Sequence, residues 1–144
     1  MGKEMAISHG AWVCSLIVAA LLLLDANGLR LKAERSLMIK REIAATREIA
    51  AIHKGQTQYY SQFGHFAGSL AELGDSRASG KNNGYIFTMS VTNEGYVITV
   101  RPEKFGSSGR RSFYSDQTHM IHQSWSAEPA TQHSPELDLD PTGQ

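Results

Sequence analysis

The sequence predicts an α+β fold, in which a long N-terminal helix with an apolar first part packs on a small antiparallel sheet of three to four strands. Apolar residues recur at helical spacing through the first half of the chain and at every second position after Gly84. We expect a disordered acidic tail over residues 126–144, because this segment has three prolines, four carboxylates and no Lys or Arg.

Composition narrows the class of protein. The chain has 144 residues, with 14 Lys and Arg against 14 Asp and Glu, so its formal net charge is zero. A neutral total provides no overall basic field, and we expect no nucleic-acid partner. The single cysteine, Cys14, excludes an intrachain disulfide and a cysteine-rich zinc site.

An apolar run predicts a membrane anchor or a signal segment over residues 1–28. No charged residue occurs from Ala6 to Leu24, and a membrane-spanning helix needs about 20 mostly apolar residues. Three interpretations stay open: a retained anchor, a signal peptide cleaved at Ala26-Asn27-Gly28, and a buried core helix. The predicted anchor consists of the large apolar residues Trp12, Val13, Leu16, Ile17, Val18, Leu21, Leu22, Leu23 and Leu24.

The long helix is expected to continue from Leu29 to Phe63, where the sequence has no proline and apolar residues recur on one face. We predict that this face packs on the sheet through a stripe made of Ile49, Ile52, Tyr59 and Phe63. Gly64 is expected to end the helix. A capping box formed by Ser69 and Glu72 predicts a short second helix.

Four segments after this point read as strands. Tyr85–Val91 and Tyr96–Val100 alternate apolar and polar residues around a short turn, which is a strong hairpin signal. Arg111–Ser115 and His119–Gln123 read as a third and a fourth strand. Together with the helix they form one predicted α+β domain over residues 29–125.

No catalytic site, metal site or cofactor is predicted, and the chain is not expected to be an enzyme. His119 and His122 would point to opposite faces of a strand and could not converge on one metal ion. Ser115 and Asp116 lack the nucleophile-elbow pattern of a serine hydrolase. The connection Gly106–Arg111 is either a plain link between strands or a cradle for an anion, and the sequence leaves both open.

The order of these parts resembles a known superfamily. The helix end reads QTQYYSQFGHFAGSLAELG, and the sheet region reads NNGYIFTMSVTNEGYVITVRPEKFGSSGRRSFYSDQTHMI. Residues 45–125 are similar to type IV pilins and to the pseudopilins of type II secretion. The resemblance implies a bacterial structural subunit held in the inner membrane, with its C-terminal domain in the periplasm or outside the cell. The partners it implies are membrane lipid and homo- or hetero-oligomeric pilin-like subunits.

The resemblance also implies a leader that is cleaved between Gly10 and Ala11. Ser15 stands where such proteins carry a glutamate that is understood to guide subunit addition. A membrane-tethered or secreted binding module that does not polymerise is therefore the alternative, and a small extracytoplasmic enzyme is a remote one. The basic flank from Arg30 to Arg41 favours a cytoplasmic C-terminal part, opposite to the placement that the resemblance implies.

Overall fold

The computed structural model describes residues 9–74 and 79–137, with side chains from residue 17 onward. One helix, α1, is followed by a single 3₁₀ turn and five strands. The chain divides into two compact units, Met1–Ser36 and Leu37–Gln144, and the second unit holds the sheet. The predicted α+β class is confirmed.

The helix α1 (His9–Phe63) continues without interruption through Asp25, Asn27 and Gly28. Glycine and asparagine cost a helix roughly 1 kcal/mol or less, so isolated ones are tolerated. The helix ends where predicted, because Gly64 has a φ of 73° and its N–H bonds the carbonyl oxygen of Tyr60 at 2.8 Å. A left-handed glycine that closes the last turn is a common helix stop.

The predicted short helix is a single 3₁₀ turn, η1 (Ala71–Leu73). The Glu72 carboxylate reaches back to accept a hydrogen bond from the backbone N–H of Gly68 at 3.0 Å, and it also accepts one from the Ser69 hydroxyl at 3.4 Å. Leu70 is buried and belongs to the core. The turn lies between the end of α1 and β1 (Lys81–Asn82).

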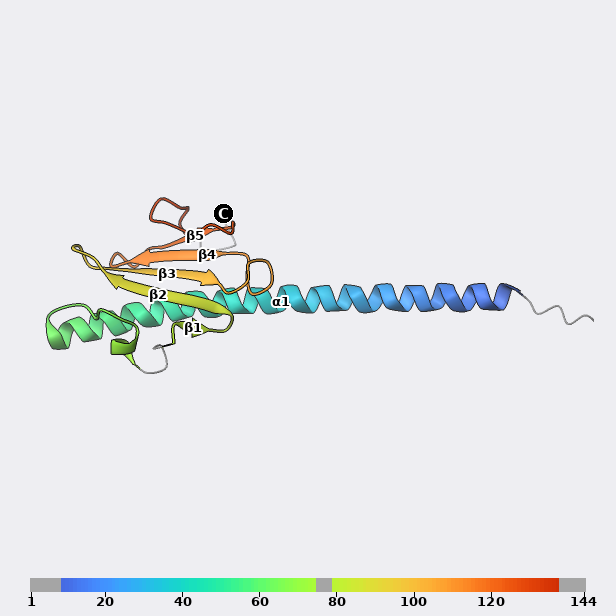
Figure 1. Cartoon of the computed structure of the whole chain (residues 1–144), viewed down its shortest axis with the longest axis horizontal. Helices are drawn as coiled ribbons and strands as arrows, with labels where there is room; N and C mark the ends of the chain where they lie inside the picture. Colours follow the sequence, from blue (N-terminus) through green and yellow to red (C-terminus); the bar gives the residue numbers. More distant parts are fainter. Residues whose placement is uncertain (1–8, 75–78, 138–144) are drawn as a thin grey trace, which may run out of the picture. The chain divides into compact units, whose positions relative to one another are not determined.

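The sheet is antiparallel throughout, and its spatial order follows the order of the chain (Figure 1). Its strands are β1 (Lys81–Asn82), β2 (Tyr85–Val91), β3 (Tyr96–Pro102), β4 (Ser112–Asp116) and β5 (Ile121–Ser124). The prediction of three to four strands missed β1. Asn83 and Gly84 have φ values of 50° and 80° and join β1 to β2 by the tight turn that an Asn-Gly pair favours.

The core of the second unit lies between α1 and one face of the sheet (Figure 1). The predicted alternation is confirmed at Tyr85 and Phe87 in β2 and at Ile98 and Val100 in β3, all of which are buried, whereas Val91 at the end of β2 is 49% exposed. Burying each large apolar side chain contributes about 1.5–3 kcal/mol relative to leaving it exposed. This burial is what fixes the second half of α1 to the sheet.

The expected disordered tail is wrong for residues 126–137, which pack on the edge of the sheet beside β5. Ala130 is 3% exposed, and its N–H bonds the hydroxyl oxygen of Ser112 at 2.9 Å. The N–H of Leu137 bonds the carbonyl of Ile121 at 2.6 Å, and Leu137 packs against the core. Backbone pairing and one apolar contact hold this polar segment, while residues 138–144 lie outside the described residues.

Candidate functional site

The predicted anchor lies on the first part of α1, within the unit Met1–Ser36. The predicted anchor residues Trp12, Val13 and Leu16 lie before residue 17, so their side chains are outside the described part of the structure. The same holds for the predicted cleavage pair, Gly10 and Ala11. The described large apolar side chains of this unit are all more than half exposed: Ile17, Val18, Leu21, Leu22, Leu23, Leu24, Leu29 and Leu31.

None of the helices in the described part of the chain is long and apolar enough to cross a membrane.

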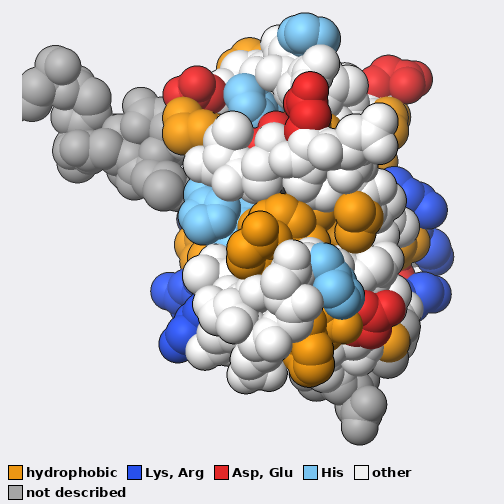
Figure 2. Space-filling model, turned by 90° about the vertical axis from the view of Figure 1, so that its left-hand side faces the viewer, with side chains coloured by type: hydrophobic (Ala, Val, Ile, Leu, Met, Phe, Trp, Pro, Cys, Tyr) orange, Lys and Arg blue, Asp and Glu red, His pale blue; other side chains and the backbone are white. Residues whose placement is uncertain are grey.

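The predicted packing stripe is confirmed at Ile49 and Ile52, which are 0% and 1% exposed. It is wrong at Phe63, which is 56% exposed, and Tyr59 is only half-buried. These two rings pack on each other, with centroids 4.5 Å apart. Figure 2 views this end of the molecule and shows apolar and histidine side chains together on its surface.

A buried ion pair joins α1 to the connection between β3 and β4. Glu42 is 4% exposed, and its carboxylate accepts hydrogen bonds from the backbone N–H of Arg110 and from Nε of Arg111, both at 2.9 Å. Charge-assisted hydrogen bonds of this kind are about twice as strong as neutral ones. The pair sets the register of the helix against this end of the sheet.

The rest of the Arg111 guanidinium is also occupied. Its Nη1 donates to Oε1 of Gln123 at 3.1 Å, and its Cζ lies 4.8 Å from the ring centroid of Trp125. The aromatic face attracts the cation, and this contact holds an indole that is itself 64% exposed. Arg111 therefore links α1, β5 and the segment after β5.

A second polar network crosses the core at His53, which is 5% exposed. Its Nε2 lies 2.8 Å from the hydroxyl oxygen of Ser115, and its Nδ1 lies 2.6 Å from that of Tyr96. The Ser115 hydroxyl donates to the carbonyl of Met120 at 2.7 Å, so it must accept from His53. This assigns the proton to Nε2 and makes Nδ1 the acceptor of the Tyr96 hydroxyl.

Burial and the nearby His119 lower the pKa of His53 from 6.5 to about 4, against the opposing effect of the Asp116 carboxylate. Burial and the Asp116 charge raise the pKa of Tyr96 to about 12. At neutral pH both groups are therefore uncharged, which suits a hydrogen-bonded pair inside a core. The network positions the two strands and carries no free charge.

His119 covers this network from outside. Its ring centroid lies 4.4 Å from that of His53. Its backbone φ is 68°, a value that residues other than glycine rarely adopt. The predicted strand His119–Gln123 begins two residues later than expected, because His119 lies in the turn. His122 is in β5 and bonds the carbonyl of Ser134 at 2.7 Å through Nδ1. Only His122 therefore lies in a strand, whereas the sequence analysis placed both histidines in one.

Ser115 and Asp116 do not form a hydrolase-like site with His53. Ser115 is fully buried, with its hydroxyl proton directed to Met120, whereas the Asp116 carboxylate accepts the N–H and hydroxyl of Thr118 at 2.9 and 2.6 Å. Partial burial works to raise the pKa of Asp116, but these bonds and two nearby histidines outweigh it and lower the pKa. The carboxylate shapes the turn after β4.

Gln56 is the third buried polar side chain of α1, at 0% exposure. Its amide accepts from the backbone N–H of Ala67 at 2.9 Å and donates to the carbonyl of the same residue at 3.0 Å. These paired bonds hold the segment after Gly64 against the helix, so both polar groups of a buried peptide unit are satisfied.

The anion-cradle interpretation of Gly106–Arg111 is not supported, because the loop uses its own N–H groups. Gly106 bonds the carbonyl of Gly109 at 2.8 Å, and Ser107 and Ser108 both bond that of Lys104, at 3.1 and 2.8 Å. Gly109 has to be glycine, because a Cβ there would overlap the phenol oxygen of Tyr85. The connection is a packed turn under Tyr85.

Sequence reasoning missed the roles of Glu42, His53 and Gln56. The only available signal was their spacing, which places three polar residues on the same helical face as Ala45, Ile49 and Ile52. Within the described ranges, no group of three His, Cys, Asp or Glu residues could hold a metal ion.

No family model, curated protein or solved structure matches this chain.

Proposed function

We propose that this chain is a pilin-like or pseudopilin-like structural subunit of a membrane-anchored filament or secretion assembly, and that it does no chemistry of its own. The observation that carries the proposal is the exposed apolar surface of α1. Every large apolar side chain described between Ile17 and Leu31 is more than half exposed. Single exposed apolar residues are ordinary, but a contiguous set marks a surface that lipid or other proteins cover.

The architecture of the second unit supports the same proposal. One face of α1 is buried against an antiparallel sheet, and its three polar side chains are bonded within the unit; this face consists of Glu42, Ala45, Ile49, Ile52, His53 and Gln56. One helix thus has a first part whose large apolar side chains are exposed among the described residues, and a second part with one face covered by the sheet. We place the protein in a bacterial inner membrane, with the sheet in the periplasm or outside the cell.

The alternative function is a membrane-tethered or secreted binding module that does not polymerise. It is favoured by Ser15, which stands where pilin-like proteins carry a glutamate understood to guide subunit addition. In that case the apolar segment would serve only for attachment or export.

The mass of the mature N-terminus is the first test. Protein isolated from membranes is expected to begin at Ala11 if a leader is removed as in pilins. A start near Leu29 would support a secreted module, and an intact Met1 would support an uncleaved anchor.

Self-association is the second test. We expect the full chain to fractionate with membranes and to give a ladder of cross-linked oligomers, and we expect both to be lost when residues 1–28 are removed. A full-length chain that is monomeric in membranes would instead favour the binding module. A full-length chain that stays in the aqueous fraction as a monomer would contradict both.

A further inference from the structure

A groove runs beside α1 in the second unit, at the end of the sheet where β2 begins. It has a volume of about 370 Å³ and is lined by Leu37, Lys40, Arg41, Ala44, Asn83 and Gly84. Two apolar side chains of the helix form its wall, and an ammonium, a guanidinium and an amide provide hydrogen-bond donors. We call this hollow the basic groove.

The connection between β3 and β4 adjoins the basic groove and adds further cations. Nη1 of Arg41 donates to the carbonyl of Ser107 at 3.4 Å, and a Cβ at Gly84 would lie 3.3 Å from that of Ser108. This connection carries the exposed side chains of Lys104 and Arg110. Figure 1 shows it lying against α1 at this end of the sheet.

These four cations have no carboxylate partner within the described segments. The two acidic residues next to these cations in the sequence are already paired, since Glu42 binds Arg111 and Glu103 lies 3.4 Å from Lys81. One exposed carboxylate, that of Glu128, belongs to the segment that bonds Ser112. The surface therefore has a clear excess of positive charge in a chain whose total charge is zero.

Two exposed aromatic rings accompany the charges. Phe105 is 46% exposed between Lys104 and the loop glycines, and Trp125 is 64% exposed, held by its contact with Arg111. Phenylalanine and tryptophan on a basic surface are typical of proteins that lie on a bilayer, where the rings enter the headgroup region. We define the docking surface as the basic groove together with Lys104, Phe105, Arg110 and Trp125.

We propose that the docking surface rests on anionic phospholipid, with a lipid phosphate held by Lys40 and Arg41 in the basic groove and with Phe105 and Trp125 among the headgroups. This inference rests on the proposed membrane attachment and names the lipid class that the second unit contacts. Each basic residue near an anionic bilayer increases the docked population about fivefold. The exposed rings favour a bilayer over an acidic protein or a nucleic acid.

The test follows the fluorescence of Trp125 in the full chain. The sequence has two tryptophans, so a Trp12→Phe variant leaves Trp125 as the only indole. This chain is reconstituted into nanodiscs of phosphatidylcholine alone, or of equal parts phosphatidylcholine and phosphatidylglycerol. Both carry a headgroup-labelled quencher, and each is measured at low and at high salt.

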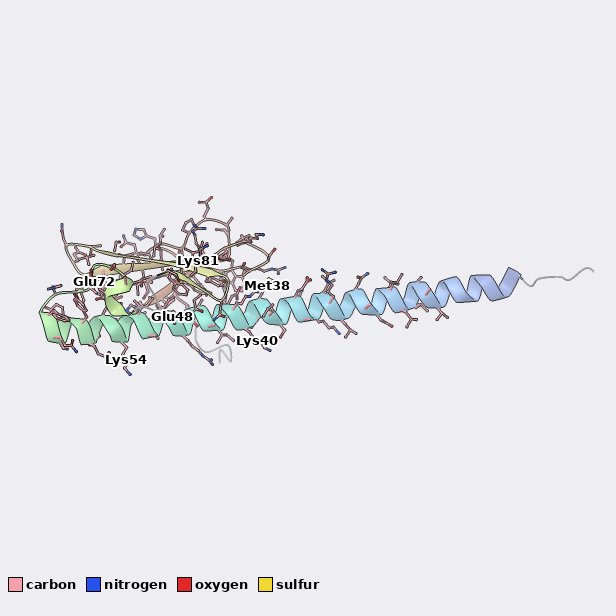
Figure 3. All side chains as sticks on the ribbon, turned by 60° about the horizontal axis from the view of Figure 1, so that its bottom comes forward. Met38, Lys40, Glu48, Lys54, Glu72 and Lys81 are labelled. Carbon is pink, nitrogen blue, oxygen red and sulfur yellow. The ribbon has the colours of Figure 1, made fainter. Side chains whose placement is uncertain are left out.

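We expect strong quenching of Trp125 in the anionic discs at low salt, weak quenching in the neutral discs, and loss of quenching at high salt. Replacing Lys40 and Arg110 by glutamine should lower the ratio of docked to undocked protein roughly 25-fold, at about fivefold for each charge. The matched control replaces Arg47 and Lys54, two other exposed cations, by glutamine and should leave quenching unchanged. Figure 3 shows Lys40 and Lys54 both projecting from α1 into solvent.

The outcomes separate the two proposals. A chain that enters both kinds of disc with Trp125 equally unquenched overturns the docking proposal and leaves the proposed membrane attachment intact. Equal quenching in neutral and anionic discs, or an equal effect of the control pair, also overturns it. A chain that fails to enter either disc contradicts the membrane attachment and the docking together, and salt-dependent binding to DNA in place of lipid overturns the docking alone.

Discussion

Glu42 and Arg111 are 69 residues apart in the chain, and their side chains meet at 2.9 Å in a buried ion pair between α1 and the strand connection. The same carboxylate caps the backbone N–H of Arg110 at the same distance. A buried charge is tolerated only when it is paired and hydrogen-bonded. The contact thus makes the docking of the helix specific to one register.

The first prediction concerns this pair. Replacing Glu42 by alanine leaves the Arg111 guanidinium without its carboxylate partner and removes the acceptor for the Arg110 N–H. We therefore expect a loss of about 3–5 kcal/mol in the free energy of unfolding. Chemical denaturation of the full-length Trp12→Phe chain in detergent, followed by the fluorescence of Trp125, measures it. The control is Glu34→Ala, which breaks the exposed pair with Arg30 and should cost less than about 1 kcal/mol. Equal losses for the two variants would show that the buried pair is not special.

The second prediction is a pH dependence set by His53. Because its pKa falls from 6.5 to about 4 on folding, the unfolded chain binds the proton first as the pH is lowered. The stabilisation is complete above pH 6.5, declines between pH 6.5 and 4, and amounts to at most about 3 kcal/mol. Denaturation at a series of pH values should show this slope.

The slope should vanish in a His53→Gln variant and persist in a variant that replaces the exposed His65 by glutamine. Asp116, whose pKa is lowered on folding, contributes at a more acidic pH, below its ordinary value of 3.8. A wild-type stability that is flat from pH 7 to 4 would contradict the assignment of a neutral, Nε2-protonated His53.

The third prediction concerns the paired bonds of Gln56. A Gln56→Leu variant keeps the volume but leaves the N–H and carbonyl of Ala67 without partners, and each buried unsatisfied group costs about 1–3 kcal/mol. We expect a total loss of about 2–6 kcal/mol in the free energy of unfolding. Gln58→Leu, at an exposed position of the same helix, should change the stability by less than about 0.5 kcal/mol. Hydrogen exchange at the Ala67 amide should also become faster in the first variant alone.

The fourth prediction concerns the contact of Gly109 with Tyr85. A Gly109→Ala variant places a methyl group on the phenol oxygen, and we expect the overpacking to cost about 1–3 kcal/mol. The hydroxyl of Tyr85 also donates to the carbonyl of Arg111 at 3.0 Å, so the clash should disturb the same strand connection. Thermal unfolding of the full chain measures the loss.

Gly68→Ala is the matched control, because its nearest neighbour outside the adjoining residues would be a Glu72 oxygen at an ordinary 3.6 Å. Tyr85→Phe removes the closest atom, so the double variant should lose less than the two single variants added together. A purely additive result would mean that the two residues do not meet.

Periodicity in the sequence was sufficient to predict α1, its stop at Gly64, the hairpin of β2 and β3, and the burial of Ile49 and Ile52. These are local properties, because an apolar repeat of 3.6 or 2 residues indicates which face of a helix or strand is buried. The same repeat could not show which turns of the helix the sheet covers, so the packing stripe wrongly included Phe63, which is 56% exposed.

The tertiary structure alone decided which polar groups are partners. Glu42 meets Arg111, His53 meets Tyr96 and Ser115, and residues 126–137 pair with β5. Each contact joins segments that are distant in the chain, and a carboxylate or an imidazole has the same local pattern whether it faces water or a partner. The sequence shows which side chains are apolar and favour burial. Only the folded chain brings each buried polar group to the hydrogen-bond partner that offsets the cost of burying it.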